Sequence, residues 1–353
     1  MGIVTEQDAW LLLNAVTGLS LRRKHALVAR TGDPRAVLAL SDDRLAELCG
    51  PKAASKIAAA RTHTADALRA QAQRLGLRIL TLADTDYPDC LRTIVDPPLA
   101  VYVRGQVPPD PRVGVVGTRR PSHEGEEVAF GIGRDLAQAG VCVVSGLARG
   151  IDAAAHRGAL EASGPTIAVL ACGLDQVYPP EHRDLADRIA HRGGLISEHP
   201  PGTPPLPHHF PARNRIVSGL ARAVVVVEAR LRSGALITAD FALEQGREVF
   251  AVPGSVLNPR SRGPHRLLRD GAHLAESADD VLELLGIPLP ARSAPLSADD
   301  RALLDVLSQP RHPDEIAGSC PGGAAALGAL LTSLELRGAV RRLAGGRYVR
   351  TVR

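Results

Sequence analysis

Aromatic residues are scarce in this sequence. Phe, Trp and Tyr together make up 3% of its 353 residues, which excludes an extended aromatic platform of the kind on which OB folds stack bases. Lysine is scarcer still, because only Lys24, Lys52 and Lys56 stand among the 42 basic residues. The remaining cations are arginines, whose planar guanidinium group suits phosphate and nucleic-acid partners. A net charge of +4 and a pI of about 9.0 make the chain basic without being extreme.

Other absences bound the class of protein. No apolar run is long enough for a membrane span, and the N-terminus shows no charged-then-apolar signal segment, so we expect a cytoplasmic protein with no membrane partner. The five cysteines show no C-x-x-C spacing, which disfavours a metal site. Cys142 and Cys172 fall in or beside apolar runs and are expected to be reduced core residues. A chain of 353 residues is expected to form two or three domains.

Two nucleotide-binding signatures are also missing, the P-loop G-x-x-x-x-G-K-[ST] and the dinucleotide pattern G-x-G-x-x-G. The sequence does contain Val113-Gly-Val-Val-Gly117-Thr-Arg119-Arg-Pro-Ser122. This run predicts a strand buried on both faces, a tight turn at Gly117 and a helix capped by Ser122. The free N–H groups of such a helix start, with Arg119 beside them, attract phosphate. Taken alone, the motif fits a turn without a ligand equally well.

Strands and helices alternate after this motif. The expected strands are 141–144, 166–170, 195–197, 223–227 and 248–252, and the expected helices are 150–162, 181–191, 213–220 and 235–245. Two more strands, 77–82 and one that ends near Gly105, precede the motif. Repeated alternation of this kind predicts an α/β fold with a doubly wound, Rossmann-like parallel sheet.

Smaller segments flank the sheet. Residues 5–75 are predicted to be helical, ending with one helix from Ala53 to Leu75, and form a small all-helical domain over 1–76 of the SAM or helix-hairpin-helix kind. This domain is either a contact module or a packing unit. The sheet domain is expected over 77–287, and prolines mark a linker over 288–296. Three helices and a terminal hairpin predict a winged helix over 297–353.

Ligands of α/β sheets collect beyond the carboxyl ends of the strands. Glycine turns and polar residues follow the strands here, namely Gly117-Thr118-Arg119, Ser145-Gly146-Leu147-Ala148-Arg149-Gly150-Ile151-Asp152, Cys172-Gly173-Leu174-Asp175, Glu198 and Glu228. Three such turns at one edge favour a close approach of backbone to ligand, although tight crossovers also use glycine. The cluster Phe210-Pro-Ala-Arg213-Asn214-Arg215 adds an amide and two guanidinium groups at a helix start.

The carboxylates raise the question of an enzyme. Asp152, Glu198 and Glu228 have no nucleophile pattern of Ser, Cys or His beside them. We expect Asp152 and His156, which share one helical face, to form a structural hydrogen-bonded pair. The proline-rich loop that holds His208-His209 offers no further ligand at metal spacing, so no metal is expected there.

Together these residues resemble the DprA/Smf family, the DNA-processing proteins of bacterial natural transformation. The resemblance covers roughly 85–275 and departs from the family at His265, where asparagine is common. It rests on Tyr87-Pro88 with Asp96-Pro97-Pro98, Tyr102 to Gly105, Val116-Gly-Thr-Arg119-x-x-Ser122, Val144-Ser-Gly-Leu-Ala-x-Gly150-Ile-Asp152-x-x-Ala-His156, Gly173-Leu-Asp175 with Tyr178-Pro179, Ser197-Glu198, Phe210-Pro-x-Arg-Asn-Arg-Ile216, Val226-Val-Glu228-Ala, Ser233-Gly-x-Leu-x-Thr238-Ala and Val249-Phe-Ala-Val-Pro-Gly254.

The resemblance implies a homodimeric protein, not an enzyme and without a cofactor, that binds single-stranded DNA. It further implies a recombination mediator that displaces single-strand-binding protein and loads RecA onto incoming DNA. We expect the grip on DNA to depend on backbone charge and on turn N–H groups, because aromatic residues are few. Phe210 either stacks on a base or packs in the core. The predicted DNA contacts are Gly117, Thr118, Arg119, Ser122, Ser145, Gly146, Arg149, Arg183, Phe210, Arg213, Asn214 and Arg215.

Two other functions stay open. A nucleotide-binding or nucleotide-cleaving enzyme on a related sheet would use Glu198 or Glu228 as its acid, and a structural adaptor would need neither. The segment from Arg337 to Arg353 contains six arginines and no acidic residue. This charge favours either a weak contact of the C-terminal domain with duplex DNA or a contact with another protein. The helix over 323–336 lacks the Arg, Asn or Gln that reads base edges, so we expect removal of this domain at about Ser293 to leave single-strand binding largely intact.

Overall fold

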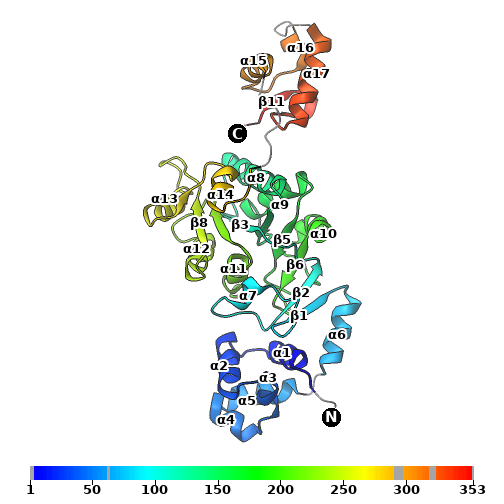
Figure 1. Cartoon of the computed structure of the whole chain (residues 1–353), viewed down its shortest axis with the longest axis vertical. Coiled ribbons are helices and arrows are strands. Elements are labelled where there is room, and N and C mark those ends of the chain that lie inside the picture. The colour runs from blue at the N-terminus through cyan, green and yellow to red at the C-terminus, as the bar shows by residue number, and fades with distance from the viewer. Residues whose placement is uncertain (1–3, 62–63, 290–296, 318–322, 352–353) are drawn as a thin grey trace. The chain divides into compact units, whose positions relative to one another are not determined.

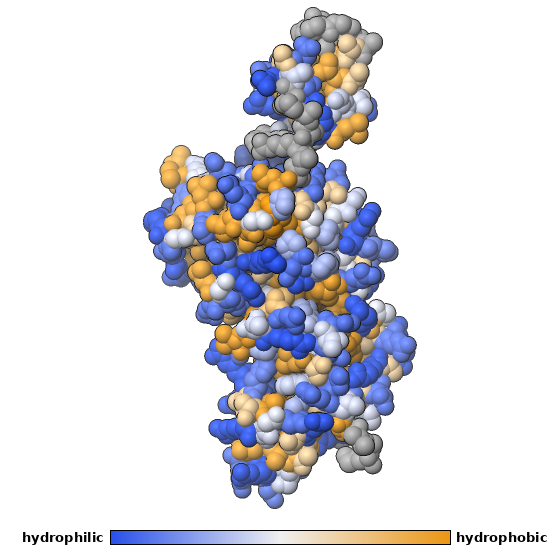
Figure 2. Space-filling view, in the orientation of Figure 1, coloured by the Kyte–Doolittle hydropathy of each residue, from blue (hydrophilic) through white to orange (hydrophobic). Residues whose placement is uncertain are grey.

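The structure is a computed structural model that describes residues 4–61, 64–289, 297–317 and 323–351. The chain divides into two compact units, Met1–Pro288 and Leu289–Arg353, and each is described by itself (Figure 1). Within the described residues, no helix combines the length and the apolar character needed to cross a membrane. Figure 2 shows hydrophilic and hydrophobic residues interspersed over the face of the larger unit that it presents.

Six helices open the larger unit. They are α1 Glu6–Ala15, α2 Leu21–Thr31, α3 Pro34–Ala39, α4 Asp42–Cys49, α5 Pro51–Ala60 and α6 Ala65–Arg74. Their core includes Trp10, Leu13 and Ile57, whereas Leu11 packs with residues of the sheet. The single helix predicted from Ala53 to Leu75 is wrong, because the Thr64 side chain accepts a hydrogen bond from the Ala67 N–H and starts α6 as a separate helix.

Nine strands form one sheet in the order β1-β2-β6-β5-β4-β3-β7-β8-β9. Their bounds are β1 Arg78–Thr81, β2 Ala100–Gly105, β3 Arg112–Val116, β4 Cys142–Ser145, β5 Thr166–Val169, β6 Gly194–Ser197, β7 Ala223–Val226, β8 Glu248–Ala251 and β9 His273–Leu274. Strands β3 to β9 pair in parallel, which confirms the predicted doubly wound sheet. The short β9 was not predicted.

Strands β1 and β2 extend this sheet antiparallel, β2 along β6 and β1 along β2. Between β1 and β2 the chain forms one short helix, α7 Asp89–Arg92, and the alternation predicted from the sequence begins only after these two strands. The sheet therefore ends in antiparallel strands on this side.

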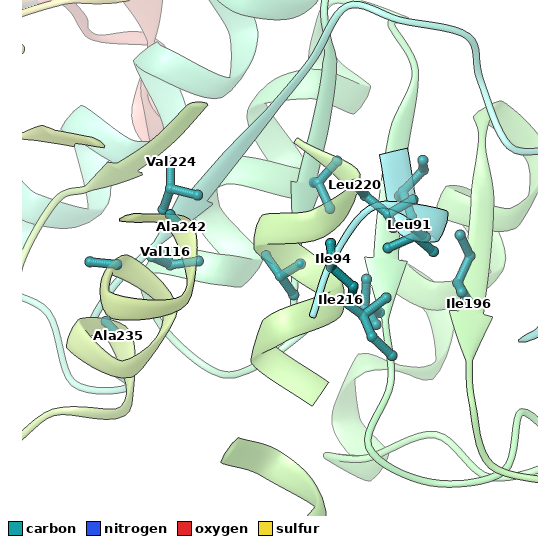
Figure 3. Packing of buried hydrophobic residues seen from close by; sticks show 14 of the residues in the cluster. Leu91, Ile94, Val116, Ile196, Ile216, Leu220, Val224, Ala235 and Ala242 are labelled. Carbon is teal, nitrogen blue, oxygen red and sulfur yellow. The ribbon is translucent and has the colours of Figure 1, made fainter. Parts of the chain in front are cut away.

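Helices cover both faces of the sheet. On one face lie α8 His123–Gln138, α9 Ile151–Glu161 and α14 Ala278–Leu284, with α10 Arg183–Arg192 beside them. On the other face lie α11 His209–Leu220, α12 Gly234–Glu244 and α13 Arg262–Arg269. Successive strand residues point to opposite faces, so Val115 packs with α8 and α9 whereas Val116 packs with α12 (Figure 3). Cys142 and Cys172 are free and buried, as predicted.

The prediction that Asp152 and His156 are hydrogen-bonded to each other is wrong. His156 turns toward β5, and its Nδ1 lies 2.7 Å from Oγ1 of Thr166. Asp152 instead faces the turn that precedes α9, where backbone N–H groups donate to its carboxylate. Both side chains are buried, and each satisfies a different polar neighbour.

We expect His156 to make stability depend on pH. Burial lowers the pKa of His156 to about 3, so between that value and the ordinary 6.5 the unfolded chain binds one more proton than the folded chain. The free energy of unfolding therefore falls with decreasing pH, by about 1.4 kcal/mol per pH unit for this group. Urea unfolding of the wild type and of His156→Gln between pH 6 and pH 4 measures the difference. A constant difference between the two proteins across that range would contradict the prediction.

The smaller unit consists of α15 Ala298–Val306, α16 Pro313–Ile316, α17 Gly323–Leu336, β10 Val340–Arg342 and β11 Tyr348–Arg350. Leu303, Leu331 and Leu334 are part of its core. Three helices followed by a two-stranded antiparallel sheet match the predicted winged-helix outline. Most of the expected linker (290–296), together with Cys320 and Arg353, lies outside the described residues.

Candidate nucleic-acid interface

A cleft of about 520 Å³ lies at the carboxyl ends of the central strands. In the strand order, β3 has β4, the next strand of the chain, on one side and the much later β7 on the other. This reversal is the topological switch point at which open α/β sheets bind ligands. The lining residues that also belong to the predicted contacts are Gly117, Thr118, Arg119, Gly146, Phe210, Arg213 and Asn214.

The turn after β3 forms one wall. A Cβ at Gly117 would come within 2.9 Å of the Glu228 carbonyl oxygen, so the tight turn there requires glycine. Ser122 caps α8 as predicted, because its hydroxyl accepts from the Gly125 N–H at 3.0 Å. Glu228 accepts from both the N–H and the hydroxyl of Ser122, at 2.9 and 2.7 Å. One carboxylate thus ties the start of α8 to the end of β7.

The turn after β4 forms the floor. The buried Asp152 carboxylate accepts from the N–H groups of Gly146 at 3.1 Å and Ala148 at 3.4 Å. Leu147 has φ 57° and Gly150 has φ 75°, so the chain doubles back on itself between these bonds. Burial raises the pKa of Asp152, and the nearby Arg213 guanidinium opposes that shift. Asp152 therefore shapes the backbone of the cleft.

Helix α11 contributes two arginines, both of which are buried. Arg213 is 4% exposed and donates to the Val169 carbonyl oxygen at 2.6 Å. Its Nε has no hydrogen-bond partner in the structure, and burial lowers the pKa of its guanidinium group. Arg215 is 8% exposed and pairs with Glu198 at 2.6 Å. Only Arg213 lines the cleft, and Arg215 anchors α11 to the end of β6.

The rim combines an exposed cation with two aromatic rings. The guanidinium carbon of Arg119 lies 5.1 Å from the centre of the Phe210 ring. Tyr178 meets the same ring edge-on, with the ring centres 5.5 Å apart. Arg119 is exposed and Phe210 is half-buried, so a charge and a flat apolar surface are both open to solvent. Tyr178 is not among the predicted contacts, although its place after the glycine turn at Cys172–Asp175 was a usable signal.

The other predicted contacts do not line the cleft. Ser145 is fully buried and donates to the Val115 carbonyl oxygen at 2.6 Å. Arg149 is exposed but pairs with Glu181 at 2.5 Å. Arg183 is exposed at the first residue of α10. A contact of Arg149 or Arg183 with DNA therefore depends on a path that extends beyond the cleft, whereas the side chain of Ser145 is closed off from any ligand.

The acidic candidates of the rival enzyme are engaged in protein contacts. Glu198 pairs with Arg215, and Glu228 also accepts from the side-chain amide of Asn258 at 3.0 Å. The ring of His199, in the proline-rich loop, stacks on the ring of His209, the first residue of α11, with ring centres 4.1 Å apart. Burial lowers the pKa of His199 to about 4. Among the described residues, no group of three or more His, Cys, Asp or Glu side chains is placed to hold a metal ion.

Comparison with known proteins relates both units to the same protein family. Residues 78–286 match the family model described as DNA recombination-mediator protein A, and residues 287–346 match the DprA winged helix domain. The chain is 44% identical over 213 residues to DNA processing protein DprA of Bacillus subtilis, covering 60% of this chain and 72% of that protein. It is 48% identical over 207 residues to protein Smf of Escherichia coli, covering 58% of this chain and 55% of the relative.

Solved structures show a similar fold. The X-ray structure of DNA processing protein A from Streptococcus pneumoniae superposes with a TM-score of 0.69 at 35% identity, covering 80% of this chain and 98% of that one. DNA processing protein A from Helicobacter pylori, studied for its single-stranded DNA binding mode, superposes with a TM-score of 0.53 at 30% identity. That match covers 59% of this chain and 95% of the other.

Proposed function

The chain belongs to the DNA recombination-mediator protein A family, and on that premise we propose that it binds single-stranded DNA in the cleft at the ends of β3, β4 and β7. The observation that carries the proposal is the position of Arg119, exposed above the Phe210 ring at the turn that leads into α8. The related protein of Helicobacter pylori supports the choice of ligand, because it binds single-stranded DNA.

The geometry assigns different tasks to different residues. Arg119 contacts a phosphate, and the turn that begins at Gly117 lets the DNA strand approach the protein backbone closely. An unpaired base packs against the exposed parts of Phe210 and Tyr178, because every base has a face that can stack on an aromatic ring. Arg213 lies below them as a buried cation. Among the predicted contacts, Ser145 and Arg215 are buried and bonded within the protein, so they support the site without contacting DNA.

The wider role follows from the family. We propose that the protein acts in the cytoplasm as a homodimer, displaces single-strand-binding protein and loads RecA onto incoming DNA in natural transformation. The sheet domain over 77–287 binds the single strand, the helical segment over 1–76 is a contact module or a packing unit, and the winged helix over 297–353 adds at most a weak contact with duplex DNA. The match of residues 287–346 to the DprA winged helix domain supports a separate C-terminal domain.

Binding of DNA across a salt series tests the proposal. We expect labelled oligothymidylate to bind more tightly than a duplex of the same length. The logarithm of its binding constant should fall with the logarithm of salt concentration by about 0.7 for each neutralised phosphate. Fluorescence anisotropy at several salt concentrations measures both quantities. Equal affinity for the two forms, or binding that does not change with salt, would contradict the proposal.

We also expect no ATP hydrolysis and no DNA cleavage. The sequence has no P-loop, and the two acids that an enzyme would use are hydrogen-bonded to Arg215 and to Ser122 and Asn258. Phosphate release and gel assays of the intact strand measure the two activities. Turnover that persists through further purification and disappears in Glu198→Gln or Glu228→Gln would establish the rival enzyme.

A further inference from the structure

The loop that follows β8 exposes two adjacent aliphatic side chains. Val256 is 79% exposed and Leu257 is 89% exposed. Single hydrophobic residues are scattered over most protein surfaces, but two neighbours at these fractions on one loop tip expose nearly all of their apolar area. The cleft residues described above do not include either of them.

Hydrogen bonds hold this loop in one shape. Asn258 donates its backbone N–H to the Ser255 carbonyl oxygen at 3.0 Å and its side-chain amide to Glu228 at 3.0 Å. The Asn258 side chain also accepts from the Arg260 N–H at 3.0 Å. At the base, the Ala229 N–H donates to the Arg260 carbonyl oxygen at 2.7 Å. The tip is therefore pre-organised, and a ligand that contacts it loses little loop entropy on binding.

The loop stands beside the proposed DNA site. Glu228, which holds Asn258, also holds Ser122 at the start of α8. Arg260 reaches across to the Arg120 carbonyl oxygen, with Nε 2.6 Å away, so its guanidinium group lies next to the turn that carries Arg119. Arg262 follows within the same segment and is exposed. Cations that suit a phosphate backbone thus flank the apolar tip.

These observations select nucleic-acid bases as the ligand of the tip. Two side chains are far too small for a stable protein interface, which buries roughly 800 Å² on each partner. A single strand offers phosphates to the arginines and unstacked apolar base faces to the aliphatic groups. Proteins that distort nucleic acids insert aliphatic side chains between bases in this way.

We propose that Val256 and Leu257 form a base wedge, which contacts unstacked bases of a strand that runs from the cleft across Arg119 to the loop. This inference rests on the proposed function, because it requires a single strand at the cleft. The wedge spaces the bases while the arginines bind the backbone. Its contribution to affinity therefore depends on the presence of bases and is insensitive to salt.

Two oligomers of equal length test the wedge, oligothymidylate and a chain of abasic deoxyribose phosphates, each titrated into the full-length protein. We expect Val256→Ser/Leu257→Ser to lower the affinity for oligothymidylate by about tenfold, as for partial burial of two aliphatic side chains. Affinity for the abasic chain and the salt dependence should match the wild type. Val95→Ser, which replaces a valine that is 71% exposed on another loop, is the matched control and should change neither.

Each other result overturns the wedge. If the double variant binds oligothymidylate as tightly as the wild type, Val256 and Leu257 do not contact bases and the tip is a surface for a protein. If the double variant loses the same affinity for both oligomers, the two side chains act on the sugar-phosphate backbone and not on the bases. Failure of the wild type to bind either oligomer would refute the proposed function as well, so the two failures are distinguishable. Thermal melts of the double variant should match the wild type, because neither side chain packs in the core.

Discussion

Replacing Arg119 by alanine should lower the affinity for single-stranded DNA by about tenfold at physiological salt and reduce the salt slope by about 0.7. Arg119 is exposed and lies over the Phe210 ring, so its loss removes a phosphate contact and uncovers the aromatic face. The thermal stability should fall only slightly, because an exposed cation–π contact contributes about 0.5–1 kcal/mol. Anisotropy titrations at several salt concentrations measure both effects.

Two variants separate the role of Arg119 from general charge. Arg23→Ala removes an exposed arginine from α2 and should leave affinity nearly unchanged, since that helix contributes no residue to the cleft lining. Arg119→Lys keeps the charge but loses the planar group, so it should retain the salt slope and recover affinity only in part. If Arg119→Ala binds as the wild type does, or if Arg23→Ala loses as much affinity, the cleft is not the DNA site.

Gly146→Ala should lower the free energy of unfolding by about 3 kcal/mol and weaken single-strand binding by more than tenfold. A methyl group at this position would overlap the guanidinium group of Arg213. That group is buried and bonded to the Val169 carbonyl oxygen, so it cannot move aside without leaving Asp152 uncompensated. Displacement of Arg213 would also reshape the floor of the cleft. Urea unfolding and anisotropy titrations measure the two effects.

The matched control is Gly131→Ala on α8, where an added Cβ meets nothing within 4 Å. Alanine is favoured over glycine in a helix by up to about 1 kcal/mol, so this variant should be slightly more stable than the wild type. The double variant Gly146→Ala/Arg213→Ala has no overlap. Its loss of unfolding free energy should therefore be smaller than the sum of the losses in the two single variants. Wild-type stability of Gly146→Ala would show that Arg213 is not locked in place.

The location of the site could be predicted from the sequence because of one geometric rule. Parallel strands of a doubly wound sheet end at one edge, so residues as distant in sequence as Gly117, Gly146 and Phe210 were expected to meet there, and all three line the cleft. The cap at Ser122 was predictable for a similar reason, since it depends only on residues of its own helix start.

The burial of the polar residues could not be predicted. Arg215 and Ser145 look like contacts in sequence, but their partners, Glu198 and Val115, belong to other elements and have no periodic relation to them. The ring of Tyr178, on the loop after β5, meets Phe210 at the start of α11, and neither segment specifies the geometry of the other. His156 likewise contacts Thr166, on the next strand, and not the acid of its own helix. Contacts of this kind depend on tertiary packing, which local propensity does not encode.

The pairing of β3 with β7 also fixes when the site can exist. This ladder joins Val113 to Ala223 and Val116 to Val226, and the loops at its ends form the cleft. During synthesis, therefore, the first wall of the cleft leaves the ribosome long before its partner strand, and β2 likewise waits for β6. Contacts between such distant segments form late, after the local helices. A nascent chain that stops before β7 can carry the whole motif around Gly117 and still have no DNA site.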